Sequence, residues 1–274
     1  MTALARKATH PIGAAFDEAE DYDVYARVQG RIAEALADRI AALPIAVARG
    51  EKLRLLEIGC GTGFLTRALR YRGLGGCWLV TDIAPRMVSR CAAAMGGHGR
   101  NPSLSFATLD GQAPDPQLGE FDLICSSMAF QWFGDLRSAL SRLAMLLAPG
   151  GTLAFSTLLD GTFSEWEQAH HGLGLKAGGF CYTNLELLSG LFPSGGSLTI
   201  GEMHVRDAYA NAAMFLRGLK CIGASTARSD HRPLSPAALR RVMAAFNMAG
   251  ATATYRVALC NWTFPSAKDD LPHD

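Results

Sequence analysis

The stretch Leu53-Arg-Leu-Leu-Glu-Ile-Gly-Cys-Gly-Thr-Gly63 decides the fold of this chain. A short apolar run ends in Glu57, and glycine then occupies every second position up to Gly63. This order is typical of a strand, a turn without side chains and the start of a helix. A second apolar run ends about twenty residues later in Asp82, where such folds hold the ribose of an adenosine. The two runs together predict a site for an adenosine-containing cofactor.

Strands and helices alternate through the first 160 residues. Strands are predicted at 53–58, 77–82, 103–108, 121–127 and 151–158, and helices lie between them near 63–71, 85–95 and 135–148. Short connections between such elements indicate parallel βαβ units. Ala148-Pro-Gly-Gly151 is expected to end a helix and turn the chain into the next strand.

The pattern differs at the two ends of the chain. Residues 1–15 carry no regular pattern, and apolar spacing predicts one helix from Tyr22 to Leu43. After Asp160 we expect helices near 163–171, 184–191, 208–219 and 235–247, with strands at 198–206 and 253–263 that pair at one sheet edge. The predicted fold is therefore a Rossmann-like, doubly wound α/β fold with a mostly parallel seven-stranded sheet. It forms a single domain over residues 1–274, with an N-terminal lid helix (1–45), a cofactor-binding core (50–160), and an inserted helical cap with edge strands (161–274).

Composition excludes several classes of protein. The chain has 274 residues, 49% of them hydrophobic, and a formal net charge of +1, so no strong field favours nucleic acid or a membrane surface. Its seven cysteines are scattered without metal or disulfide spacing, which favours reduced thiols in the cytoplasm. The N-terminus shows no apolar signal segment, and no run is long enough for a transmembrane helix. We expect no metal, no nucleic-acid partner and no membrane partner, and the oligomeric state stays open.

The residues at the carboxyl ends of the strands suit S-adenosylmethionine. Asp82 can accept two hydrogen bonds from a ribose diol, Asp110 can accept from an adenine amine, and Ile83 and Met87 can sandwich the adenine ring. The predicted cofactor-binding residues are Glu57, Gly59, Cys60, Gly61, Gly63, Asp82, Ile83, Met87, Asp110, Gly111 and Ser126.

A nicotinamide dinucleotide is the competing cofactor, and its fingerprint is G-x-G-x-x-G. Here the spacing is G-x-G-x-G, and Glu57 would repel a pyrophosphate while it tolerates an ammonium or sulfonium group. The same residues could also have purely structural roles. The glycines could form only a tight turn, Asp82 and Asp110 could cap helices, and Trp132 with Phe130 could belong to the core. An amide at Gln131 is harder to place in a core, because it needs partners.

The chain resembles class I S-adenosylmethionine-dependent methyltransferases in residues 57–63, Asp82, Asp110-Gly111, Phe121-Asp122 and Leu147–Gly151. From about residue 14 to 263 it is similar, more narrowly, to the malonyl-[acyl-carrier protein] O-methyltransferases of biotin synthesis. That resemblance lies in Ser126-Ser-Met-Ala-Phe-Gln-Trp132, residues 154–161 and 165–170, Leu219-Lys-Cys-Ile-Gly-Ala224 and the final strand. Residues 172–181 are richer in glycine than is usual there.

The narrower resemblance implies an enzyme that esterifies the free carboxylate of malonyl-acyl carrier protein or malonyl-CoA. Lys220 and Tyr22 would then hold the carboxylate, and Gln131 and Trp132 would shape the pocket. The lysine could equally be an exposed residue of a helix. The rival hypotheses are a methyltransferase for another small carboxylate or a quinone-like ring, and a non-catalytic cofactor-binding assembly factor.

An acyl carrier protein is usually acidic, and the C-terminal part of the chain offers it a basic region. Between residues 203 and 262 eight basic residues face two acidic ones, a local excess of +6 that would steer an acidic partner. The same arginines could instead form a solvated helix face. The residues are Arg206, Arg217, Lys220, Arg228, Arg232, Arg240, Arg241 and Arg256, against Asp207 and Asp230.

Overall fold

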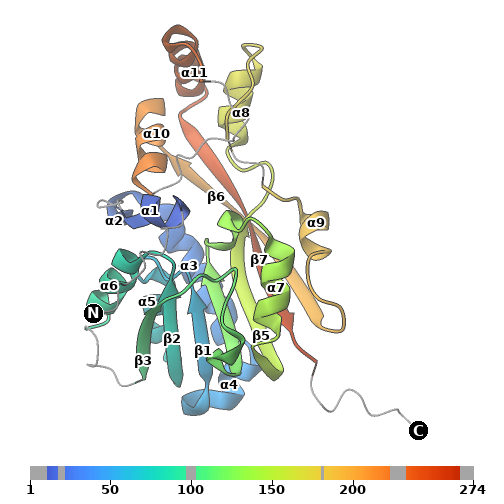
Figure 1. Ribbon diagram of the computed structural model, residues 1–274. Helices are drawn as coiled ribbons and strands as arrows, with labels where there is room; N and C mark the ends of the chain where they lie inside the picture. Colours follow the sequence, from blue (N-terminus) through green and yellow to red (C-terminus); the bar gives the residue numbers. More distant parts are fainter. Residues whose placement is uncertain (1–10, 18–21, 97–102, 180–181, 223–232, 266–274) are drawn as a thin grey trace, which may run out of the picture.

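The described residues form a central seven-stranded sheet with the strand order β3-β2-β1-β4-β5-β7-β6 (Figure 1). The computed structural model describes residues 11–17, 22–96, 103–179, 182–222 and 233–265. Strands β1 to β5 are parallel, whereas β7 is antiparallel to both β5 and β6. The strands are β1 Arg54–Ile58, β2 Cys77–Asp82, β3 Leu104–Thr108, β4 Phe121–Ser127, β5 Leu147–Leu158, β6 Ser197–Ala208 and β7 Thr252–Thr263. The chain passes from β1 outward to β3 and then returns to β4, so the strand order reverses beside β1, where such sheets bind ligands.

Helices connect these strands and cover both faces of the sheet. The α-helices are α1 Pro11–Asp17, α2 Tyr22–Tyr25, α3 Arg27–Ala41, α4 Pro44–Arg49, α5 Phe64–Tyr71, α6 Pro85–Ala94, α7 Leu136–Ala144, α8 Ser164–His171, α9 Leu185–Ser189, α10 Ala212–Cys221 and α11 Pro236–Met248. The described residues also form three short 3-10 helices, η1 Gly50–Lys52, η2 Pro116–Leu118 and η3 Phe130–Trp132. The predicted α/β fold with a doubly wound, mostly parallel sheet is confirmed.

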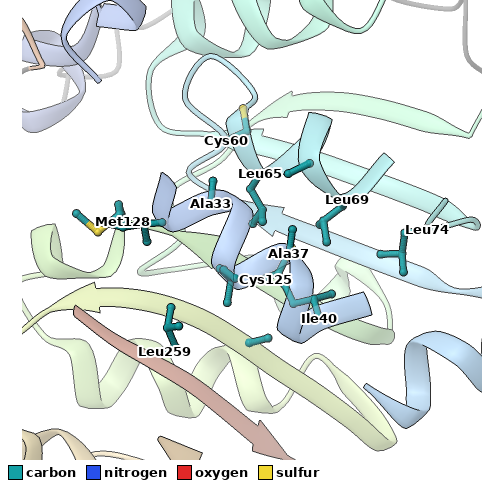
Figure 2. Packing of buried hydrophobic residues seen from close by; sticks show 14 of the residues in the cluster. Ala33, Ala37, Ile40, Cys60, Leu65, Leu69, Leu74, Cys125, Met128 and Leu259 are labelled. Carbon is teal, nitrogen blue, oxygen red and sulfur yellow. The ribbon is translucent and has the colours of Figure 1, made fainter. Parts of the chain in front are cut away.

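The hydrophobic core has one layer on each face of the sheet. On one face, α3 and α5 pack their apolar sides against β1, β4 and β7, and Figure 2 shows Ala37 and Ile40 of α3 close to Leu69 of α5. On the other face, α7 and α9 cover Ile124, Phe155 and neighbouring strand residues. The strands are therefore buried on both sides, which explains their continuous apolar runs.

A third apolar cluster lies beyond the carboxyl ends of the parallel strands. It joins α8, α10 and α11 through residues such as Phe215 and Phe246, whose rings stack at 5.2 Å. The long strands β6 and β7 extend past the rest of the sheet and reach these helices, as Figure 1 shows. The predicted edge pair with inserted helices is confirmed. The cap thus stands over the end of the sheet where the sequence places its site residues.

Four local predictions were wrong. The helix expected from Tyr22 to Leu43 is interrupted at Ala26, whose ψ of 33° is not helical, so α2 and α3 are separate. The helix expected up to residue 148 ends at Ala144, and Leu147 already pairs with Phe121. The Pro-Gly-Gly segment lies inside β5 as a register shift, because the pairing resumes only at Thr152. Within the N-terminal stretch predicted to be irregular, residues 11–17 form α1.

Candidate active site

The glycine loop between β1 and α5 has a conformation that other residues adopt with strain. Gly59, Gly61 and Gly63 have φ values of 69°, 54° and 91°. A Cβ built on Gly59 would lie 2.5 Å from the Cβ of Ala129, so a side chain there would collide with the segment after β4. At Gly61 the same position meets open space. The loop therefore presents bare backbone to whatever occupies the space beside it.

Asp82 holds this loop in place from the end of β2. Its carboxylate accepts hydrogen bonds from the backbone N–H of Gly61 at 2.8 Å and of Ala84 at 2.9 Å. Burial raises the pKa of Asp82, and the backbone hydrogen bonds oppose that rise. The alternative of a helix cap is wrong for Asp82, because the N-cap of α6 is Ala84 and no side chain caps it. Each carboxylate oxygen keeps a further lone pair for a ligand.

Glu57 is the last polar residue of β1 and is almost fully buried. Its Oε2 accepts a hydrogen bond from the Thr66 hydroxyl at 2.8 Å. Burial raises the pKa of Glu57 well above its ordinary value, and the Thr66 hydrogen bond only partly opposes this. A cationic ligand beside this carboxylate would reverse the effect of burial, because an opposite charge favours the ionised form.

A large cavity lies at the switch point of the sheet, with about 670 Å³ of empty space that is partly open to solvent. Its polar wall contains Asp82, Asp110 and the backbone of the glycine loop, and its apolar wall contains Met87 and Trp132. The N-terminal helices contribute Phe16 and Tyr22, which also pack against Ala84 and Met87. Gly111 lies on the floor, where a Cβ would stand 2.3 Å from Cγ2 of Ile58. The floor, too, excludes a side chain.

Two further cavities adjoin the large one. The small cavity, about 300 Å³, lies between Glu57, the glycine loop and Tyr22. The side cavity, about 400 Å³, lies under the cap, where Tyr182, Leu219 and Tyr255 line it. Tyr22 is common to all three cavities. The three spaces thus meet at one tyrosine.

The structure brings most of the predicted cofactor residues to the large and small cavities. The residues found there are Glu57, Gly59, Cys60, Gly61, Asp82, Ile83, Met87, Asp110 and Gly111. Two others do not line any of the three cavities. Gly63 begins α5, and a Cβ there would lie 2.9 Å from Sγ of Cys91. Ser126 is buried with an unpartnered hydroxyl, and its neighbour Ser127 faces the large and small cavities instead.

The predicted substrate residues are divided between the side cavity and the surface. Tyr22, Gln131 and Trp132 line the side cavity, and Gln131 donates from Nε2 to the Met128 carbonyl at 2.7 Å. Phe130, by contrast, is buried in the core. The Lys220 side chain is exposed on α10 and lines none of the three cavities, although its neighbours Leu219 and Ile222 do. Sequence reasoning missed Gln29, Tyr182 and Tyr255, which reach the side cavity from α3, the segment before α9 and β7.

The residues that line the large and small cavities fit a cationic adenosine derivative. Asp82 and Asp110 offer acceptors for hydroxyl and amine groups, and Ile83 with Met87 offers an apolar wall for a flat ring. Glu57 offers a buried carboxylate at the other end of the glycine loop, which favours a positive charge. A pyrophosphate would meet only repulsion from this carboxylate.

Comparison with known proteins decides the family. A family model described as a methyltransferase domain matches residues 27–196, more than half of the chain. This chain belongs to the methyltransferase family. It is a class I methyltransferase whose cofactor is S-adenosylmethionine, as the resemblance in its sequence implies.

Relatives of this methyltransferase carry specific names. It is 44% identical over 252 residues to the biotin biosynthesis bifunctional protein BioCD of Bordetella avium. The aligned region covers 91% of this chain but only 51% of the relative. The chain thus spans about half the length of that relative. It is 40% identical over 263 residues to the malonyl-[acyl-carrier protein] O-methyltransferase of Magnetococcus marinus, covering 95% of this chain and 94% of the relative.

Solved structures show the same fold. The YcgJ protein of Bacillus subtilis superposes with a TM-score of 0.60 at 13% identity, over 86% of this methyltransferase and 99% of that chain. The phosphoethanolamine N-methyltransferase 2 of Haemonchus contortus, in complex with S-adenosyl-L-methionine, gives a TM-score of 0.54 at 15% identity, over 95% and 59%. At these identities the likeness shows the fold alone.

Proposed function

We propose that this methyltransferase esterifies the free carboxylate of a malonyl thioester, carried by an acyl carrier protein or by coenzyme A, for synthesis of a biotin precursor. The name of the Magnetococcus marinus relative supports the substrate, and the name of the Bordetella avium relative supports the place in biotin synthesis. The observation that carries the proposal is the side cavity, which adjoins the cofactor cavity and has only neutral side chains among its described lining residues. Since carboxylates are already ionised at neutral pH, such a nucleophile needs no general base.

The residues of the chain then have positioning roles. When bound, S-adenosylmethionine supplies a methyl group on a cationic sulfur, which leaves as a neutral thioether. Tyr22 lies where the three cavities meet, and burial raises the pKa of its hydroxyl, so Tyr22 stays protonated and can donate to a substrate oxygen. The rings of Phe16 and Trp132, whose centroids are 5.8 Å apart, line both the large and the side cavity and give the boundary between them an apolar wall. This reaction requires the protein to align the two reactants and to keep water out of the site.

The cap offers a basic surface for a carrier protein. Arg217 and Lys220 of α10, and Arg240 and Arg241 of α11, are exposed, and these two helices pack together in one cluster. Other members of the predicted basic set differ. Arg256 is neutralised by Glu202 and Asp160, and Arg228, Arg232 and Asp230 lie outside the described residues.

The scattered cysteines fit a reducing compartment, so we place the reaction in the cytoplasm. No described helix has both the length and the apolar run for crossing a bilayer.

Reversing a charge on this surface tests the docking. We expect Lys220→Glu to raise KM for malonyl-acyl carrier protein about threefold to tenfold at low ionic strength, and much less at high salt, because rim charges act through screened attraction. KM for a short malonyl thioester without a carrier should stay unchanged. Lys52→Glu, at an exposed lysine of η1, is the control. An equal loss with the short thioester would place Lys220 at the carboxylate instead.

The activity itself is tested with labelled S-adenosylmethionine. Malonyl-acyl carrier protein should gain a base-labile methyl ester, and acetyl-acyl carrier protein should gain none, because it has no free carboxylate. Turnover of neither substrate, by protein that binds the cofactor, would contradict the proposal and favour an assembly factor.

A further inference from the structure

Gln29 is a buried amide without a partner. It lies in the first turn of α3 and is 9% exposed, and its Oε1 is shielded from solvent without any hydrogen bond. A buried polar group without a partner costs free energy, so native chains retain few of them outside functional sites. The residue is therefore a candidate for binding something that the chain itself does not supply.

The position of Gln29 between two cavities indicates which ligand it binds. It lines both the side cavity and the small cavity, so it stands on the wall between the proposed substrate space and the Glu57 end of the cofactor space. Only Tyr22 lines these same two cavities with it. Because α2 and α3 are consecutive, one short segment presents a phenol and a carboxamide at the boundary between the two cavities.

Other polar groups of the side cavity have partners within the chain. Gln131 donates from Nε2 to the Met128 carbonyl, although its Oε1 is buried without a partner, and the Tyr255 hydroxyl shares a hydrogen bond of 3.2 Å with that of Tyr209. In the small cavity, Glu57 already offers a carboxylate for the positive end of the cofactor. Among the described residues that line the side cavity, Gln29 and Tyr22 are the two that also line the small cavity, so they are the polar groups placed at the boundary for a group with two oxygens. The Gln29 carboxamide can supply a donor through Nε2, since its O and N positions can be exchanged by a flip.

From this arrangement we propose that Gln29 and Tyr22 together bind the free carboxylate of the substrate, one oxygen each, and that Gln29 sets the selectivity for an ionised acyl group. This inference rests on the proposed function. Two neutral donors suit the reaction better than a cation, because a full positive charge would stabilise the attacking carboxylate and lose that interaction when a neutral ester forms. Neutral donors hold and orient the carboxylate at a smaller cost to its reactivity.

Gln29→Leu tests the assignment, with Gln117→Leu at an exposed glutamine of η2 as the matched control. We expect KM for malonyl-acyl carrier protein to rise about tenfold, the usual scale for one hydrogen bond to a charged group. The dissociation constant of S-adenosylhomocysteine, measured by calorimetry, should stay within about twofold, since the cofactor keeps its own contacts. The ligand-free variant should also melt no lower than wild type, because leucine removes a polar group that had no partner.

A second measurement does not depend on turnover. Protein loaded with S-adenosylhomocysteine should bind malonyl-acyl carrier protein more tightly than acetyl-acyl carrier protein, and Gln29→Leu should lose about tenfold of that preference. Three results would overturn the inference: an unchanged KM and preference, a parallel loss of S-adenosylhomocysteine affinity, or a lower melting temperature accompanied by both losses. Absence of methyl transfer by the wild-type protein would instead refute the proposed function, so the two failures are distinguishable.

Discussion

Asp82→Ala is expected to weaken the binding of S-adenosylmethionine more than about 100-fold. The substitution removes a buried carboxylate that accepts hydrogen bonds from Gly61 and Ala84 and lines the cofactor cavity. Hydrogen bonds to a charged group contribute about 1.5–3 kcal/mol each, and this variant loses both the ligand contacts and the group that fixes the glycine loop. Isothermal calorimetry with S-adenosylhomocysteine measures the effect.

The matched control is Asp115→Ala. Asp115 also accepts a backbone hydrogen bond, from Gln117 at 2.8 Å, but it is exposed and lines none of the three cavities. This control should bind with wild-type affinity, and circular dichroism should show both variants folded. A dissociation constant within about threefold of wild type for folded Asp82→Ala would contradict the ribose role of this carboxylate.

Glu57→Gln should change stability and cofactor binding in opposite directions. Burial raises the pKa of Glu57 above its ordinary value of 4.5, so the folded chain holds this proton more tightly than the unfolded chain. The carboxyl therefore costs no stability near pH 4.5, and it costs more as the pH rises toward its folded pKa. We expect ligand-free Glu57→Gln to melt above wild type at pH 8, and the difference to disappear near pH 4.5.

Binding of the cofactor should show the opposite effect. With the cationic cofactor present, the wild-type carboxylate gains a partner that glutamine cannot replace, and affinity should fall roughly 10- to 100-fold in the variant. Calorimetry and thermal melts over the same pH range measure both quantities. Thr66→Val, which removes only the hydroxyl that donates to Glu57, should leave most of the affinity intact. Equal affinity of Glu57→Gln and wild type would show that this carboxylate does not face the positive charge.

The sequence predicted the sheet and most of the cofactor cavity because both depend on local patterns. Apolar runs that end in Glu57 and Asp82 fix two neighbouring strands, and parallel pairing then brings their carboxyl ends together. Boundaries were less predictable where tertiary pairing overrides a local signal. The segment from Ala148 to Gly151 has the chemistry of a turn, yet its position between Leu147 and Thr152 is set by pairing with β4.

The substrate side of the site could not be predicted in the same way. Gln29, Tyr182 and Tyr255 come from three distant parts of the chain, and no spacing in the sequence relates them. The position of Lys220 depends on which side of α10 faces the side cavity. Ser126 and Ser127 differ only in the phase of one strand. A shift of one residue along a strand reverses which side chain meets the cavity.

Tyr22 gives the enzyme a thermodynamic property as well as a site. This single side chain lines both the cofactor cavities and the side cavity proposed for the acyl group, so ligands in the two spaces share one contact residue. The two affinities are then linked, and any factor by which the nucleoside strengthens acyl binding must equal the factor by which the acyl group strengthens nucleoside binding. In the proposed reaction, selection of the acyl group and retention of the methyl donor are therefore one reciprocal equilibrium.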